Sequence, residues 1–171
     1  MTVEKIGVVG AGQMGTGIAH VLALAGYDVV LDDINKDALG KAIERVQKNM
    51  QRQAAKGVIS EDQIAPALAR IRITESLDDL RDRDLVIEAA TEDEVIKKKI
   101  FQDLCKRISD KAMIATNTSS ISVTRLASVT DRPESFIGLH FMNPVPLMQL
   151  VEVIRGIATN DATFQAALEI V

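Results

Sequence analysis

The chain has 171 residues, 47% of them hydrophobic, and a formal net charge of −4. This length suits one compact domain with a sizeable core and is too short for two, so we expect residues 1–171 to form a single domain. The balanced charge and the lack of Trp argue against a nucleic-acid partner. No apolar run approaches the roughly 18 residues of a membrane-spanning helix, so we expect a soluble protein without a membrane partner.

The N-terminal residues Met1–Lys5 lead directly into an apolar run, without the cationic segment or cleavage site of a signal peptide. The single cysteine, Cys105, excludes an intramolecular disulfide and agrees with a reducing compartment. We therefore expect a cytoplasmic location. No metal site is expected.

The first elements form a βαβ pattern. The apolar run at 6–9 predicts a strand, apolar residues at helical spacing over 14–25 predict a helix ending at Gly26, and the β-rich run Asp28–Asp33 predicts a second strand. Residues 36–69 then read as two helices joined near 56–59, with Ser60 and Glu61 as N-terminal signals for the second helix.

Strands and helices alternate in the rest of the chain. Candidate strands lie at 72–74, 84–88, 113–116, 136–140 and 150–154, and a last helix is predicted over 161–171. Repeated βα units predict an α/β fold with a doubly wound, mostly parallel sheet of the Rossmann type, interrupted by the helical pair after the second strand.

A helix predicted over 94–108 has an apolar face that includes Cys105. We therefore interpret this cysteine as a core residue and not as a nucleophile. The expected face comprises Ile96, Ile100, Phe101, Leu104, Cys105 and Ile108.

The turn after the first strand, Gly10-Ala11-Gly12-Gln13-Met14-Gly15, fits the pattern G-x-G-x-x-G between a strand and a helix. In such turns the first glycine permits the tight bend, the second leaves room for a pyrophosphate, and the third allows the helix to pack closely on the sheet. Free N–H groups at the helix start would face the anion. The motif therefore predicts dinucleotide binding, with packing alone as the alternative.

An acidic residue at the end of the second strand completes this pattern. Asp33 can accept hydrogen bonds from both adenosine ribose hydroxyls and would repel a 2′-phosphate, which favours NAD over NADP. Asp32 is the alternative, since side chains alternate along a strand, and it could also be a solvated strand end. We prefer Asp33.

Five segments together resemble the 3-hydroxyacyl-CoA dehydrogenase family, which includes bacterial 3-hydroxybutyryl-CoA dehydrogenases. One departure is Met142, where the family usually has Phe. The segments are Gly10–Ala19 (GAGQMGTGIA), Asp84–Ala90 (DLVIEAA), Asn117–Ser120 (NTSS), Gly138–Pro146 (GLHFMNPVP) and Leu150–Ile154 (LVEVI).

The resemblance implies NAD-dependent interconversion of (S)-3-hydroxyacyl-CoA and 3-oxoacyl-CoA. Removing the hydroxyl proton requires a base, which a neutral imidazole can provide near pH 7. His140 precedes a proline-rich segment at a strand end, whereas His20 lies within a helix as a surface or packing residue. Glu152, in an apolar strand that we expect to be buried, is the predicted partner of His140; a Glu at a strand edge facing water is the alternative.

Further roles follow from the resemblance alone. Ser119 and Asn143 match groups that contact substrate and nicotinamide, although the Ser119 segment could be an ordinary turn and cap. Lys97 would otherwise be read as part of a solvated helix face. The expected cofactor contacts are Gly10, Gly12, Gln13, Met14, Gly15, Asp33, Glu92, Lys97, Ser119 and Asn143. The expected coenzyme A contacts are Asn49, Lys56 and Ser119, and the expected catalytic residues are His140, Glu152 and Ser119.

Members of the resembled family continue into a helical C-terminal domain that closes the substrate cleft and forms a homodimer. We therefore expect this chain to fold and bind NAD with little or no turnover. The alternatives are a non-catalytic relative, such as a lens crystallin, and a β-hydroxyacid dehydrogenase with a lysine base. An intact His140 and Glu152 count against the first, and the helical pair counts against the second.

Overall fold

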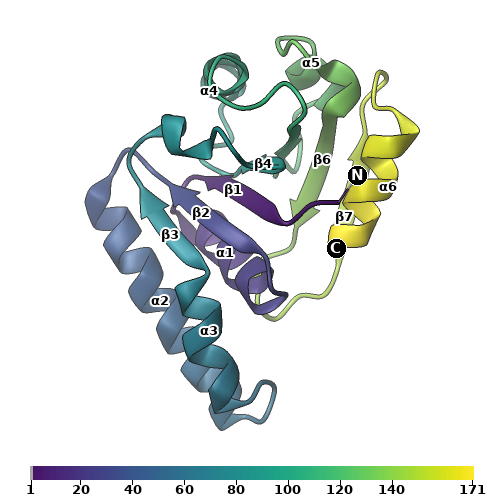
Figure 1. Ribbon diagram of the computed structural model, residues 1–171. Coiled ribbons are helices and arrows are strands. Elements are labelled where there is room, and N and C mark those ends of the chain that lie inside the picture. The colour runs from purple at the N-terminus through teal and green to yellow at the C-terminus, as the bar shows by residue number, and fades with distance from the viewer. Residues whose placement is uncertain (1) are drawn as a thin grey trace.

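The computed structural model describes residues 2–171, and these form one seven-stranded sheet with helices on both faces (Figure 1). The strands are β1 (Lys5–Val9), β2 (Asp28–Asp32), β3 (Ile71–Thr74), β4 (Leu85–Glu88), β5 (Met113–Thr116), β6 (Phe136–Phe141) and β7 (Val151–Arg155). The helices are α1 (Gln13–Leu24), α2 (Lys36–Ala55), α3 (Ile64–Ala69), α4 (Glu94–Cys105), α5 (Val123–Ala127) and α6 (Asp161–Ile170), with 3-10 turns η1 (Glu61–Gln63), η2 (Leu77–Leu80) and η3 (Pro133–Ser135).

The strand order is β3-β2-β1-β4-β5-β6-β7. Every neighbouring pair is parallel except β6 and β7, which run antiparallel. The order reverses between β1 and β4, and the carboxyl ends of these two strands therefore flank the crevice where such sheets bind ligands. The predicted doubly wound, mostly parallel sheet is confirmed.

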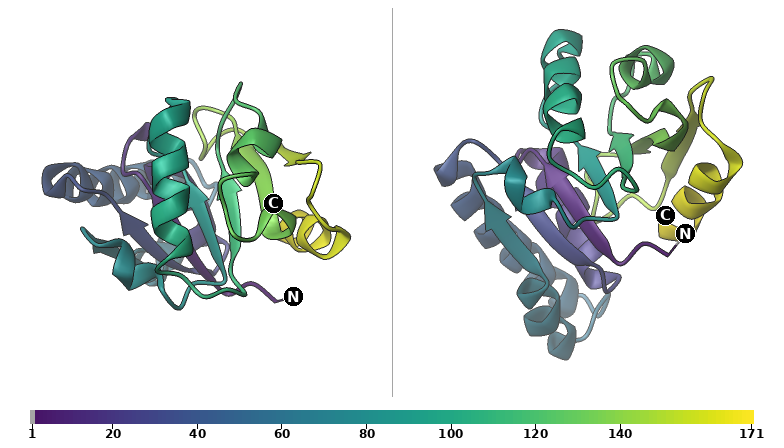
Figure 2. Two further views of the ribbon diagram at one scale, coloured as in Figure 1. Left: turned by 90° about the horizontal axis from the view of Figure 1, so that it is seen from above. Right: turned by 45° about the horizontal axis from the view of Figure 1, so that its top comes forward.

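Two apolar layers hold the helices against the sheet. Side chains alternate along the strands, so Leu85 and Ile87 join the cluster under α1, α2 and α6, while Val86 joins the cluster under α4 and α5. Figure 2 shows α4 and α5 on the face opposite to α1 and α2. Within residues 2–171, no helix is long and apolar enough to span a membrane.

The helical pair between β2 and β3 follows from local signals. The Asn35 side chain caps α2 by accepting the backbone N–H groups of Asp37 and Ala38. The chain then turns at Gly57, which has a φ of +70° that favours glycine. A capping box between Ser60 and Gln63 starts the second helical segment. The predicted insertion of two helices is confirmed.

The apolar face predicted for α4 is rotated from the observed one. Ile96 is 49% exposed, whereas Lys97 is fully buried beside Glu88 on β4. The buried charge pair turns the helix so that Lys97 and Phe101 face the sheet, and Cys105 packs partly buried against the same cluster. The buried residues of this segment are Lys97, Phe101, Leu104 and Ile108.

Asp32 ends β2 with its side chain buried, so the alternative of a solvated strand end is wrong. Burial, followed by the nearby charges of Asp33 and Asp79, raises the pKa of Asp32 to about 7. Between about pH 4 and about pH 7, the Asp32 carboxyl is therefore protonated in the folded state and ionised in the unfolded state. The stability contributed by the protonated carboxyl is lost as pH rises from about 4 through about 7.

We predict that Asp32→Asn raises the melting temperature more at pH 8 than at pH 5, by a few degrees, because the neutral amide removes the cost of burying a charge. Thermal unfolding followed by circular dichroism at both pH values measures the difference. Glu75→Gln, which neutralises an exposed carboxylate, is the control and should show no such difference. An equal effect of Asp32→Asn at pH 5 and pH 8 would contradict the assignment.

Candidate cofactor and catalytic site

The glycine turn brings the backbone of β1, α1 and β4 into close contact. Gly10 has a φ of +103°, and a Cβ atom there would lie 2.5 Å from the Cα atom of Ala90. A Cβ atom on Gly15 would collide with the carbonyl oxygen of Gly10. Gly12 faces open space and caps α1 without a side-chain acceptor, so the N–H groups of the first turn are left for a ligand.

Asp33 lies directly against this turn. Its Oδ2 atom accepts the backbone N–H of Ala11 at 2.7 Å, and its Oδ1 atom accepts that of Asn35 at 2.8 Å. Each carboxylate oxygen has a second lone pair for a ribose hydroxyl. Since Asp32 is buried, Asp33 is the acidic residue that the fold presents beside the glycine turn.

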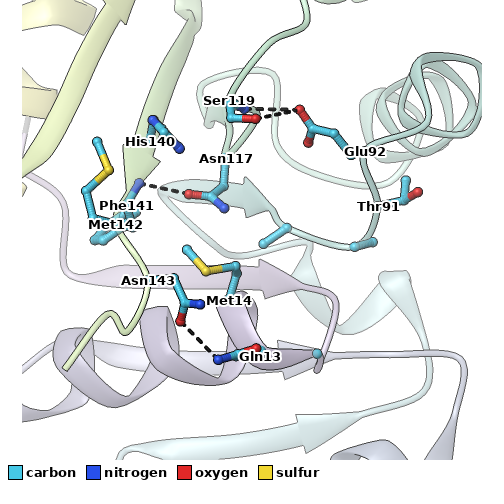
Figure 3. A pocket seen from close by; sticks show the side chains of 13 residues that line it. Gln13, Met14, Thr91, Glu92, Asn117, Ser119, His140, Phe141, Met142 and Asn143 are labelled. Carbon is cyan, nitrogen blue, oxygen red and sulfur yellow. Dashed lines mark hydrogen bonds between the residues drawn. The ribbon is translucent and has the colours of Figure 1, made fainter. Parts of the chain in front are cut away.

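A cavity of about 480 Å³ extends from the glycine turn to the end of β6 (Figure 3). It lies over the carboxyl ends of the central strands, where α/β sheets of this kind bind ligands. Its lining residues are Gly12, Gln13, Met14, Ala89, Ala90, Thr91, Glu92, Asn117, Ser119, His140, Phe141, Met142 and Asn143.

His140 and Glu152 face each other across β6 and β7. The Nδ1 atom of His140 lies 2.7 Å from Oε2 of Glu152, and the antiparallel register places the two residues directly opposite. The expectation that Glu152 is buried is wrong: β7 is an edge strand, and this side chain is 51% exposed. The carboxylate still fixes the ring, because Nδ1 is engaged and Nε2 remains available.

Glu92 accepts hydrogen bonds from several residues of the loop after β5. Its Oε1 atom accepts hydrogen bonds from Thr118 Oγ1 at 2.6 Å, Ser119 N at 3.1 Å and Ser120 Oγ at 3.2 Å. Ser119 Oγ lies 3.4 Å from the same atom. Partial burial acts to raise the pKa of Glu92, but these donors and the charge of Lys97 outweigh it and hold the pKa below its usual value.

Lys97 lies beneath the cavity and does not line it. Its Nζ atom is 2.5 Å from Oε2 of Glu88, 3.4 Å from Oγ1 of Thr116 and 4.0 Å from Oε2 of Glu92. The reading of Lys97 as part of a solvated helix face is therefore wrong. Oε1 of Glu88 in turn accepts the N–H of Ala90, so the buried pair supports the segment that forms the cavity wall.

A second cavity, of about 300 Å³, lies between α1, α2 and the segment after β6, and Asn49 lines it. Asn143 and Gln13 line both cavities, and Asn143 Oδ1 accepts a hydrogen bond from Gln13 Nε2 at 3.0 Å. Lys56 is exposed at the C-terminal end of α2, seven residues beyond Asn49 and therefore about 10 Å further along the helix axis.

His20 is a packing residue and not a helix-surface residue. It is 1% exposed, and its Nε2 atom lies 2.8 Å from Oε1 of Gln53 on α2. Burial lowers the pKa of His20, despite the opposing hydrogen bond, and keeps the ring neutral near pH 7. His20 therefore joins α1 to α2 beside the second cavity.

Asn117 lines the cavity, and no role was predicted for it from the sequence. Its Oδ1 atom accepts the backbone N–H of Phe141, the residue after His140, at 2.9 Å. Its position in the sequence could have indicated a role. Asn117 directly follows β5, and polar residues at the carboxyl ends of parallel strands face the ligand crevice.

These features define a class of protein. A parallel sheet with a glycine turn at its switch point, and an acidic residue against that turn, is a dinucleotide-binding domain of the Rossmann type. A family model described as "3-hydroxyacyl-CoA dehydrogenase, NAD binding domain" matches residues 5–171. The chain therefore belongs to the 3-hydroxyacyl-CoA dehydrogenase family and is an NAD-binding domain.

Individual relatives agree with this assignment. The chain is 59% identical over 169 residues to a 3-hydroxybutyryl-CoA dehydrogenase of Bradyrhizobium diazoefficiens, covering 99% of the chain and 58% of that protein. The crystal structure of (S)-3-hydroxybutyryl-CoA dehydrogenase from Ralstonia eutropha matches with a TM-score of 0.96 and 46% identity, covering 99% of the chain and 60% of that structure. The chain thus spans less than two thirds of the length of either protein.

We predict that Gly12→Val leaves the melting temperature within a few degrees of wild type but weakens NAD binding at least about tenfold. A side chain at this position meets open space in the protein and occupies the volume expected for the pyrophosphate. Isothermal titration calorimetry with NAD measures the affinity. Gly15→Ala is the contrasting variant and should lower the melting temperature, because its methyl group collides with the backbone. Wild-type NAD affinity in Gly12→Val would contradict this placement.

Proposed function

We propose that this domain carries the cofactor and the base for the reversible oxidation of an (S)-3-hydroxyacyl-CoA to a 3-oxoacyl-CoA. The observation that carries the proposal is the His140–Glu152 pair, with its 2.7 Å hydrogen bond, at the end of the cavity that starts at the glycine turn. A base beside a dinucleotide cavity is the arrangement that oxidation of a secondary alcohol requires.

His140 provides the proton acceptor. Bound NAD would supply the acceptor for the hydride that leaves the hydroxyl carbon, and Nε2 of His140 takes the hydroxyl proton at the same stage. Glu152 holds Nδ1, so the ring accepts through Nε2, and the carboxylate stabilises the imidazolium that results. In the reverse direction the imidazolium returns the proton to the carbonyl oxygen.

Ser119 and Asn143 are placed to orient the reacting groups. Both line the cavity with His140, and both side chains are exposed to it. The hydroxyl of Ser119 is held near Glu92, and the amide oxygen of Asn143 is held by Gln13, which leaves the amide nitrogen as a donor. We assign them to the substrate oxygen and the nicotinamide. The resulting rate gain comes from fixing the orientation of the reactants.

We assign the coenzyme A moiety to the side of α2. The second cavity, lined by Asn49 and Arg45, shares Gln13 and Asn143 with the wall of the cofactor cavity, and Lys56 lies further along the same helix. In this assignment the thioester lies near His140 and the polar arm of the coenzyme follows α2. A lysine suits a point-charge contact with a phosphate. The names of the relatives favour a 3-hydroxybutyryl group as the acyl chain.

A second, helical domain is proposed to complete the site in the full-length protein and to form a homodimer there. The side chain of His140 is 20% exposed and that of Glu152 51% exposed, so the pair is open to water in this domain. An enclosed site strengthens the electrostatic interactions of the reacting groups. A cytoplasmic location agrees with the free thiol of Cys105.

We predict that this chain binds NAD but oxidises NADH with acetoacetyl-CoA at least about 100 times more slowly than the full-length protein, because proximity and exclusion of water are incomplete. Calorimetric titration with NAD and the absorbance of NADH at saturating substrate give the two quantities. Equal turnover by the two proteins would refute the need for a second domain. Failure of both to bind NAD would refute the cofactor site.

We predict that His140→Ala in the full-length protein lowers kcat by about 100-fold to 10,000-fold, the usual contribution of a general base, and leaves NAD affinity unchanged. Glu152→Gln should lower kcat less, because the amide can still accept from Nδ1 but cannot stabilise the imidazolium by charge. Steady-state NADH consumption and calorimetry measure both effects. An unchanged kcat in His140→Ala would exclude His140 as the base.

A further inference from the structure

Asn117 links the loop that carries Ser119 to the strand that carries His140. Pairing between β5 and β6 ends at Thr116 and Gly138, but β6 continues to Phe141. The N–H of Phe141 therefore has no partner on β5, and the Asn117 side chain supplies one at 2.9 Å. Figure 3 shows this bond between the two segments.

The same bond fixes which end of the amide faces the cavity. An N–H group requires an acceptor, so the atom beside Phe141 is Oδ1 and the other end of the side chain is the NH2 group. Asn117 is 9% exposed and lines the cofactor cavity. Because Oδ1 is bonded to Phe141, Nδ2 is the end of the side chain that is left for the cavity. Among residues 2–171, the buried side-chain polar atom without a partner is Nδ1 of His20, so Nδ2 of Asn117 is accessible from the cavity and open to a ligand.

The position of Asn117 in the sheet identifies the part of the cofactor it meets. Asp33 lies at the end of β2, on the side of the switch point that takes the adenosine ribose. Asn117 lies beyond β5, on the opposite side, together with Ser119 and His140. The part of a dinucleotide that crosses the switch point toward His140 is its nicotinamide riboside half.

We propose that Asn117 is a cofactor-binding residue whose Nδ2 donates a hydrogen bond to an oxygen acceptor on the nicotinamide riboside half of NAD. The proposal rests on the assigned NAD site. Because Oδ1 is committed to Phe141, the donor is aimed before the cofactor arrives, and little rotamer freedom is lost on binding. The residue would thus help to place the nicotinamide next to His140, while the adenosine half is held independently at Asp33.

The test titrates this chain with NAD and, separately, with ADP, which fills only the adenosine and phosphate part of the site. Asn117→Asp keeps an oxygen for the N–H of Phe141 and removes the donor. We expect Asn117→Asp to bind ADP within about twofold of wild type and NAD at least about tenfold more weakly. Asn117→Ala should show the same selective loss for NAD.

Asn160→Ala is the matched control. It removes the side-chain cap of α6, a helix that does not line the cofactor cavity, and should lower the melting temperature by a few degrees without changing either affinity. Unchanged NAD affinity in both Asn117 variants, or equal losses for NAD and ADP, would overturn the proposal. A wild-type chain that binds neither ligand would instead refute the assigned NAD site.

Discussion

The backbone contact between Gly10 and Gly15 is the constraint on which the rest of the site depends. Without side chains at these positions, α1 begins directly at the end of β1 and Ala90 lies against the same turn. The N–H of Gly10 donates to the carbonyl oxygen of Asp32 at 2.7 Å, which ties the turn to β2. A single set of close backbone contacts therefore joins the ends of β1, β2 and β4 and opens the helix N-terminus toward the cofactor cavity.

Polar contacts extend this arrangement across the sheet. The buried pair of Lys97 and Glu88 supports the cavity wall, and Glu92 accepts hydrogen bonds from the loop after β5. Asn117 in turn connects that loop to β6 by a hydrogen bond. The antiparallel strand β7 then brings Glu152 to the ring of the base. Because β7 is antiparallel to β6, a short connection can join the two strands, whereas a parallel strand would need a long crossover connection. Each contact lies at a strand end, where the sheet positions side chains without filling the crevice.

The sequence predicted the sheet, the helical pair and the partner of His140, because periodicity, turn residues and a charge within an apolar strand are local signals. It did not predict which face of α4 is buried: Ile96 fits the apolar pattern, but the tertiary partner of Lys97 decides the rotation of the helix. The exposure of Glu152 depends on β7 being an edge strand, which only the topology determines. The role of Asn117 depends on how far β6 extends beyond β5, a register that no local pattern specifies.

The most direct test of the site is to observe where the nicotinamide lies in the complex. Nuclear magnetic resonance of this chain, labelled at its histidines and saturated with NAD, reports contacts between the ligand and the two imidazole rings. We expect nuclear Overhauser effects from the nicotinamide H4 proton to the ring of His140 and none to that of His20, which is buried between α1 and α2. Adenine protons in contact with His140, or a nicotinamide with no contact to His140 at saturation, would contradict the proposed orientation of the cofactor and the role of the base.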